Sequence, residues 1–249
     1  LDSLVVFTAL GDVVTVAPGV LSLTVTGPFA GQIPAGDDNL CLRAARAVRA
    51  QAAITLDKRL PPASGIGGGT ADAAAVLRAL GRVPDQPESL GADLPACLAS
   101  RPLRMRGVGE RIDPANDLPD LHLVLVNPRC EIPTPAVFAA LDRRDSPPLP
   151  DLPGALDAAG LAAWLRGTAN DLQPAALRIE PAVAACLAAL NDAGAWLARM
   201  SGSGATCFGI FPDAIAARAA AGRIADARPG WWVAPTVTIA GLSPPGGAG

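Results

Sequence analysis

A glycine-dense segment lies between a strand-like run and an alanine-rich run, and its residue types suit phosphate binding. It reads Pro61-Pro-Ala-Ser-Gly-Ile-Gly-Gly-Gly-Thr-Ala71. Glycines let backbone N–H groups converge on a ligand, and the first turn of a helix adds unbonded donors and a positive dipole end. No Gly-Lys-Ser/Thr follows, and Thr70 replaces the third glycine of the dinucleotide fingerprint. We therefore predict a phosphate-binding loop of another kind; the alternative is a tight strand-to-helix turn.

A second run of small residues, Met200-Ser-Gly-Ser-Gly-Ala-Thr206, follows a strand-like run much later in the chain. By itself it fits a hairpin turn as well as an anion-binding nest. Two such loops in one chain favour a shared phosphorylated ligand. The chain has one histidine, His122, and one lysine, Lys58, so chemistry that needs paired histidines or several lysines is excluded within this sequence.

The runs around these loops predict an α+β fold. Short β-rich runs over residues 4–10, 12–17 and 20–26 predict an opening antiparallel meander. A following helix has Leu40, Ala44, Ala47 and Val48 on its apolar face, with Asp37 or Asp38 as its cap. Later strands are predicted over 53–58, 121–126, 196–200, 208–211 and 231–239. Helices are predicted over 71–80, 175–193 and 213–227, with a short helix within 89–98. The proline-rich stretch 146–153 predicts a surface loop, and 243–249 a frayed tail.

Composition bounds the class of protein. The 249 residues are half apolar and 17% charged, enough for a substantial core in one large domain or two small ones. The pI of about 5.1 argues against a nucleic-acid partner. Five dispersed cysteines without a C-x-x-C pair predict reduced, buried thiols in a cytoplasmic protein and no metal site. The sequence contains no apolar run long enough to span a membrane and does not open with a signal-peptide pattern, so neither a membrane span nor secretion is indicated.

Three segments give the sequence a resemblance to the GHMP small-molecule kinases: the loop over 65–70, Gly91-Ala-Asp-Leu-Pro95 and the loop over 201–204. Within that superfamily it resembles the 4-diphosphocytidyl-2-C-methyl-D-erythritol kinase family of the non-mevalonate isoprenoid pathway. The segments that carry this closer match are Leu1-Asp-Ser-Leu4, Asp38-Asn-Leu40, Asp57-Lys-Arg-Leu-Pro61, Gly107-Val-Gly-Glu110, Ile132-Pro-Thr-Pro135 and Ala169-Asn-Asp-Leu172. The match runs in order from Leu1 to about Leu242.

The resemblance implies a two-lobed fold. An N-terminal lobe like ribosomal protein S5 domain 2 would cover residues 1–118, and a ferredoxin-like lobe 119–242. It implies ATP-dependent phosphorylation of the 2-hydroxyl of 4-(cytidine 5'-diphospho)-2-C-methyl-D-erythritol. Mg²⁺ would arrive with ATP, no metal would be held by the protein alone, and the chain would be a monomer or weak homodimer.

By the same resemblance, Asp93 corresponds to the catalytic aspartate that accepts or orients the proton of the attacking hydroxyl. The implied ATP-binding residues are Asn39, Leu40, Lys58, Pro61, Pro62, Ala63, Ser64, Gly65, Ile66, Gly67, Gly68, Gly69, Thr70 and Ala71. The implied substrate-binding residues are Thr134, Phe138, Ser201, Gly202, Ser203 and Gly204, with Phe138 stacked on the cytosine. Without the resemblance, Asp93 would be a helix or turn cap, Asn39 a helix cap, Lys58 a solvated strand end and Phe138 a core residue.

Two sequence elements of the family are absent from this sequence, which begins at Leu1 rather than Met. Family members carry a Lys-x-Asn strand, whose lysine is the second catalytic residue, and a Gly-Tyr-His loop before the position that matches Leu1. Lys58 matches a different family position. We expect both elements to precede Leu1 in a longer chain. Two alternatives stay open: another GHMP kinase that acts on homoserine or a sugar, and a nucleotide-binding protein without kinase activity.

Overall fold

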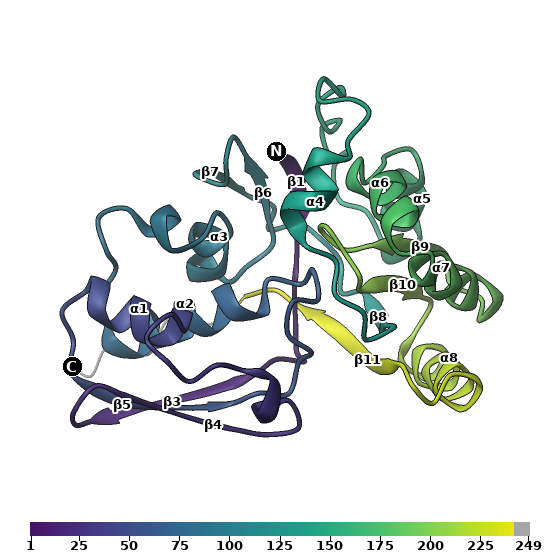
Figure 1. Cartoon of the computed structure of the whole chain (residues 1–249). Coiled ribbons are helices and arrows are strands. Elements are labelled where there is room, and N and C mark those ends of the chain that lie inside the picture. The colour runs from purple at the N-terminus through teal and green to yellow at the C-terminus, as the bar shows by residue number, and fades with distance from the viewer. Residues whose placement is uncertain (242–249) are drawn as a thin grey trace.

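A computed structural model describes residues 1–241, and the predicted tail over 243–249 lies outside the described residues. Helices and mainly antiparallel strands alternate along the chain, which confirms the α+β prediction. On the left of Figure 1, α1 (Leu40–Ala47) and α2 (Gly68–Leu80) lie over a three-stranded sheet. On the right, α7 (Ala182–Asp192) and α8 (Ala214–Ala227) accompany a five-stranded sheet.

The sheet beneath α1 and α2 contains β3 (Val13–Pro18), β4 (Ser22–Thr26) and β5 (Ala52–Asp57). The predicted meander is wrong here, because β5 lies between β3 and β4, antiparallel to the first and parallel to the second. A parallel pair needs a crossover connection, and α1 supplies it between β4 and β5. Ile54 and Leu56 of β5 are almost fully buried, so this apolar strand takes the centre of the sheet.

The five-stranded sheet has the order β2-β11-β8-β10-β9 and is antiparallel throughout. Its strands are β2 (Phe7–Thr8), β8 (His122–Asn127), β9 (Leu197–Met200), β10 (Cys207–Phe211) and β11 (Trp232–Ile239). The last four confirm the predicted strands to within one residue at each end. Val124, Val126 and Phe211 pack with residues of α7 and α8 in the largest buried core.

The apolar run predicted as one strand over residues 4–10 is wrong, because it contributes to two different sheets. β1 (Asp2–Val5) pairs with β6 (Leu103–Arg106), whereas β2 pairs with β11. β7 (Arg111–Pro114) completes the three-stranded sheet β1-β6-β7. A strand pattern predicts extended backbone but not the partner strand, so the change of sheet at Val6 has no signal in the local sequence.

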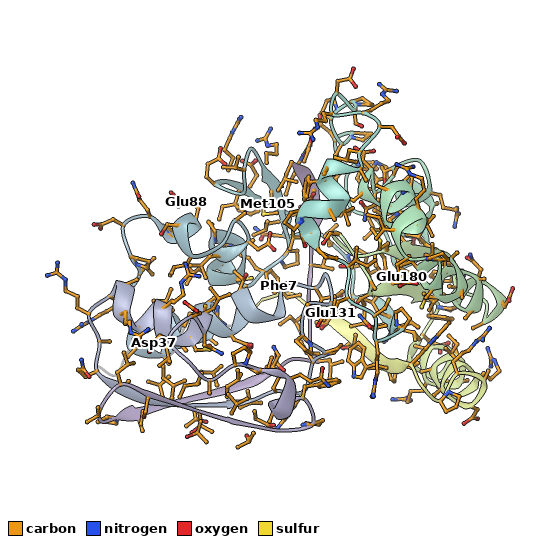
Figure 2. The ribbon with its side chains drawn as sticks, in the orientation of Figure 1. Phe7, Asp37, Glu88, Met105, Glu131 and Glu180 are labelled. Atoms are coloured by element: carbon orange, nitrogen blue, oxygen red, sulfur yellow. The ribbon has the colours of Figure 1, made fainter. Side chains whose placement is uncertain are left out.

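Phe7 lies near the centre of the molecule (Figure 2) and packs against the apolar cluster shared by α1, α2 and α3 (Leu94–Ala99). Through β2, the opening segment therefore contacts both the N-terminal helices and the five-stranded sheet. The division into residues 1–118 and 119–242 stays a prediction, and β2 joins the sheet that the second range builds.

One stretch predicted as a single helix is divided. Over 175–193, α6 (Leu172–Ile179) ends before Pro181 and α7 begins after it, because proline has no N–H to continue a helix. The short helix predicted within 89–98 is confirmed as α3, to within one residue at its end, and the 3₁₀ turn η2 (Pro87–Leu90) precedes it. The predicted cap of the last helix is confirmed, since Asp213 accepts a hydrogen bond from the Ala216 N–H at 2.8 Å.

The remaining helical elements are η1 (Ala30–Gln32), α4 (Thr134–Ala139) and α5 (Ala158–Arg166). The surface loop predicted over 146–153 is confirmed, because it contains no helix or strand and is largely exposed. All five cysteines are free, and four of them are buried. Within residues 1–241, every helix is too short or too polar to cross a bilayer.

Candidate active site

The predicted glycine loop supplies the first turn of α2. The helix begins at Gly68, three residues before the predicted start, and Gly67 precedes it in the left-handed conformation with φ of +68°. The Ala71 N–H donates to the Gly67 carbonyl oxygen at 2.9 Å. The N–H groups of Gly68, Gly69 and Thr70 therefore have no partner within the helix. These donors lie at the positive end of the helix dipole, where an anion is stabilised.

The two glycine loops touch each other. The Ser201 hydroxyl donates to the Gly65 carbonyl oxygen at 3.0 Å, and the Thr206 N–H donates to the Ser64 carbonyl oxygen at 3.1 Å. A Cβ on Gly65 would lie only 2.3 Å from the Gly204 carbonyl oxygen. The assignment of one loop to ATP and the other to the alcohol stays a prediction, but the contact means that a shift of either loop displaces the other.

Asn170 holds the second loop in place and is a residue that sequence reasoning did not include in the site. Its Nδ2 donates to the carbonyl oxygens of Met200 at 2.9 Å and Gly202 at 2.8 Å. Its Oδ1 accepts from the Leu172 N–H at 3.0 Å, at the start of α6. The only sequence signal for it was the segment Ala169-Asn-Asp-Leu172.

The start of α4 borders the same loop. The hydroxyls of Thr134 and Ser203, both predicted substrate-binding residues, are hydrogen-bonded at 2.8 Å. Phe138, one turn later in α4, is 37% exposed, so the alternative of a core residue is wrong. The structure thus brings Thr134 and Ser203 together and leaves an aromatic ring of the same helix open to solvent.

Asp93 lies beside the glycine loop, near Gly67. A Cβ on Gly67 would lie 3.8 Å from Asp93 Oδ2, in ordinary contact. Asp93 stands at the start of α3, but its side chain makes no capping hydrogen bond, so the alternative of a helix cap is wrong. The residue is exposed, and the partial burial of its carboxyl group raises the pKa above the ordinary value. The carboxylate is therefore available to a ligand beside the start of α2.

Lys58, a predicted ATP-binding residue, is buried and engaged by two carboxylates. Its Nζ lies 2.6 Å from Asp12 Oδ2 and 2.8 Å from Asp72 Oδ2, and the residue is 2% exposed. Burial disfavours the ammonium, but the two carboxylates outweigh it and raise the pKa of Lys58. Burial also raises the pKa of Asp72 to about 7, against the attraction of Lys58. The alternative of a solvated strand end is therefore wrong.

Asn39 caps α1, where its Oδ1 accepts from the Cys41 N–H at 2.9 Å. The predicted cap at residue 37 or 38 is wrong by one or two positions. Leu40, the first residue of α1, comes within 3.5 Å of where a Cβ on Gly69 would lie. The start of α1 therefore borders the glycine loop, although the cap occupies the Asn39 oxygen.

The other predicted ATP-binding residues, 61–66, form the first limb of the glycine loop, which is the segment before α2. Ser64 Oγ donates to the Pro61 carbonyl oxygen at 2.7 Å, and both residues are buried. Pro62, Gly65 and Ile66 are half-buried, and Ala63 is exposed. This limb is therefore anchored on one side and open to solvent at its tip.

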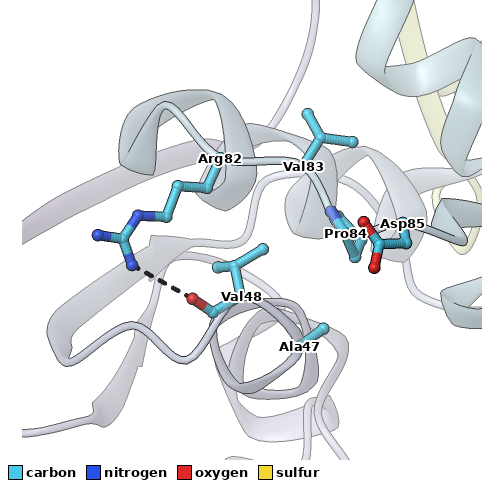
Figure 3. A pocket seen from close by; sticks show the side chains of 6 residues that line it. All are labelled: Ala47, Val48, Arg82, Val83, Pro84 and Asp85. Carbon is cyan, nitrogen blue, oxygen red and sulfur yellow. Dashed lines mark hydrogen bonds between the residues drawn. The ribbon is translucent and has the colours of Figure 1, made fainter.

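A shallow surface pocket of about 310 Å³ lies between the end of α1 and the segment that follows α2 (Figure 3). Its lining is Ala47, Val48 and the four residues 82–85, and Arg82 donates to the Val48 carbonyl oxygen at 3.3 Å. Arg82 follows the C-terminal end of α2, about 20 Å from the glycine loop at 1.5 Å per residue. The pocket therefore does not belong to the candidate site.

Comparisons with known proteins match both halves of the chain. The model described as GHMP kinases N terminal domain matches residues 39–98, and that of GHMP kinases C terminal matches 149–228. A 4-diphosphocytidyl-2-C-methyl-D-erythritol kinase of Paracoccus denitrificans is 61% identical over 98% of this chain and 88% of its own length. The chain belongs to the 4-diphosphocytidyl-2-C-methyl-D-erythritol kinase family. A member from Cereibacter sphaeroides is 55% identical over 94% of this chain and 89% of its own.

Solved structures agree on the fold of this kinase. A structure of 4-(cytidine 5'-diphospho)-2C-methyl-D-erythritol kinase has a TM-score of 0.72 and 34% identity, covering 93% of this chain and 88% of its own. Homoserine kinase of Cytophaga hutchinsonii, at 19% identity and a TM-score of 0.60 over 92% of this chain and 86% of its own, shows the fold alone. The predicted GHMP kinase fold is confirmed, and this enzyme is a small-molecule kinase of an ATP-using family.

Proposed function

We propose that this kinase transfers the γ-phosphoryl group of ATP to the 2-hydroxyl of 4-(cytidine 5'-diphospho)-2-C-methyl-D-erythritol, in the non-mevalonate pathway to isoprenoid precursors. The observation that supports it is the Asp93 carboxylate, free of capping bonds, beside the unbonded N–H groups at the start of α2. A proton acceptor next to a phosphate site is the arrangement that phosphoryl transfer to an alcohol needs. The choice of alcohol rests on the names of the relatives.

In this proposal the N–H groups of residues 68–70 bind the phosphate oxygens of ATP. Asp93 orients the attacking hydroxyl and takes its proton. A bond forms between the substrate oxygen and the γ-phosphorus, and the bond from that phosphorus to the bridging oxygen breaks, so that ADP leaves with the electron pair. Such a reaction needs positioning and charge stabilisation more than a strong base.

The substrate is held from the opposite side by α4 and the second glycine loop. Phe138 offers an aromatic face to the cytosine, and offset stacking suits two flat rings. The paired hydroxyls of Thr134 and Ser203, with the backbone of Gly202 and Gly204, offer polar contacts to the diphosphate and the alcohol.

Mg²⁺ enters with ATP in this proposal and neutralises phosphate charge. Within residues 1–241, no group of three or more His, Cys, Asp or Glu side chains could hold a metal ion, and the expectation that the protein alone holds no metal stays a prediction. Oxygens of ATP and water then supply most of the ligands, as Mg²⁺ commonly accepts. The predicted cytoplasmic location, the lack of a nucleic-acid partner and the monomeric or weakly dimeric state stay predictions; sedimentation measures the last.

Turnover with different alcohols tests the proposal. With the enzyme expressed from its complete gene, we expect ADP release in the presence of 4-(cytidine 5'-diphospho)-2-C-methyl-D-erythritol and none above background with homoserine. Cytidine diphosphate alone should raise Tm. Phosphorylation of homoserine without a thermal shift from cytidine diphosphate would favour another GHMP kinase, and ADP binding without any turnover would favour a nucleotide-binding protein.

The pH profile tests the role of Asp93. A general base works in its ionised form, so kcat/KM should fall as the pH falls through the raised pKa of Asp93. The acidic limb should therefore lie above the value of about 4 that an ordinary aspartate shows. Asp72, with a pKa of about 7, adds a second titration, and repeating the profile in Asp72→Asn removes it. Loss of the whole acidic limb in that variant contradicts the assignment.

A further inference from the structure

Asp12, Lys58 and Asp72 form a buried ionic cluster at the base of the glycine loop. They come from the connection between β2 and β3, from the residue after β5, and from the beginning of α2. Lys58 and Asp72 are 2% and 5% exposed, and the Asp12 side chain is 2% exposed. Burying a charge is costly unless the charge is paired and hydrogen-bonded. We therefore asked which part of the structure the three charged side chains hold in place.

The cluster joins the two ends of the glycine loop. At the entry, Asp12 Oδ1 accepts the N–H groups of Arg59 at 2.6 Å and Leu60 at 2.8 Å. Its other oxygen binds the Lys58 ammonium, which at its far side binds Asp72 on α2, after the loop. The segment between Leu60 and Asp72 is therefore closed at its base by one ammonium.

The ammonium also lies beside the residue that begins α2, where the proposed ATP phosphates bind. Lys58 Nζ lies 3.4 Å from where a Cβ on Gly68 would be, which is contact distance. Gly68 is the first of the three residues whose N–H groups are unbonded within α2. The orientation of those donors therefore depends on where the ammonium holds the start of the helix.

We propose that Lys58, Asp12 and Asp72 are positioning residues that fix the phosphate-binding N–H groups of α2, and that the Lys58 ammonium itself does not bind ATP. The proposal rests on the proposed ATP site. It assigns a task to two carboxylates that the motif comparison did not single out. It also replaces the predicted direct contact between the Lys58 side chain and ATP.

The two roles of Lys58 differ in what a second substitution does. If the ammonium positions the loop, its removal leaves Asp12 and Asp72 buried, close together and without a counter-charge. Because burial raises the pKa of Asp72 to about 7, the variants are compared at about pH 9, where an unpaired Asp72 carries more charge than at neutral pH. Neutralising Asp72 there removes the repulsion and restores part of the loop geometry. If the ammonium is an ATP ligand, its loss removes one contact, and the charge of Asp72 has no bearing on that loss.

The experiment compares Lys58→Met, Asp72→Asn and the double variant, with the Kd of ADP from titration calorimetry and with kcat and the KM of ATP from turnover. We expect Lys58→Met to weaken ADP binding and to lower kcat/KM for ATP about 10²-fold, the rate loss that a misplaced group causes. Asp72→Asn should stay within about twofold, and the double variant should regain about tenfold of the loss. Arg82→Met, at the other end of α2, is the control for loss of a cation. No recovery in the double variant overturns the proposal.

If Lys58→Met does not fold, two substitutions of Asp72 decide. Asparagine keeps an oxygen that accepts from the Lys58 ammonium, whereas alanine does not. Asp72→Ala should raise the Kd of ADP about tenfold and Asp72→Asn about twofold. A wild-type Kd in Asp72→Ala overturns the proposal. ADP binding does not depend on the alcohol, so a wild-type enzyme that binds ADP but phosphorylates no alcohol sinks only the proposed function; absence of ADP binding sinks both.

Discussion

Asp93→Asn is expected to lower kcat by about 10²–10⁴-fold, the usual contribution of a general base, with the Kd of ADP unchanged. The amide has the shape of the carboxyl group but cannot take the hydroxyl proton. The fold should not change, because the Asp93 side chain makes no capping hydrogen bond. Steady-state turnover and ADP titration of the enzyme expressed from its complete gene measure the two effects separately.

The control for this substitution is Asp85→Asn. Asp85 lines the shallow pocket near the far end of α2, and its loss removes the same charge without touching the candidate site. We expect wild-type kcat there. Near-normal turnover in Asp93→Asn, or a loss of equal size in Asp85→Asn, means that Asp93 is not the group that handles the hydroxyl.

Gly65→Ala is expected to separate the two glycine loops, with a loss of about 2 kcal/mol or more in unfolding free energy and at least tenfold weaker ADP binding. A methyl group there would lie 2.3 Å from the Gly204 carbonyl oxygen, and a backbone atom cannot turn away as a flexible side chain can. The φ of +74° adds strain for any residue with a Cβ. Thermal or urea unfolding gives the first number, and calorimetry the second.

Gly81→Ala is the control for Gly65→Ala, because it introduces the same kind of backbone strain without a steric clash. Gly81 has φ of +63° at the end of α2, but a Cβ there meets no atom within 4 Å. The Gly81→Ala variant should lose about 1 kcal/mol of unfolding free energy, because alanine is strained in the left-handed conformation. It should bind ADP as the wild type does. If Gly65→Ala shows the same small loss and normal ADP binding, the contact between the loops does not shape the nucleotide site.

Local sequence predicted the secondary structure correctly where the residues that define an element are neighbours along the chain. The glycine segment, the helix after it and four strands of the five-stranded sheet (β8 to β11) follow from residue types and short periods, which need only neighbours along the chain. The predicted element boundaries were wrong at Pro181, where a single residue ends one helix and begins the next. They were also wrong at Val6, where the chain leaves one sheet and pairs with a strand of another. Pairing partners are selected by the whole sheet, so no short window contains them.

The candidate site divides in the same way. The sequence by itself determined the family of the chain and the glycine loop that precedes α2, whereas phosphate binding by that loop and the catalytic role of Asp93 stay predictions. Only the tertiary structure decided that Gly65 and Ser201, 136 residues apart, share a hydrogen bond. It also decided that Lys58 lies between two carboxylates, because buried charges must find partners and those partners come from distant segments.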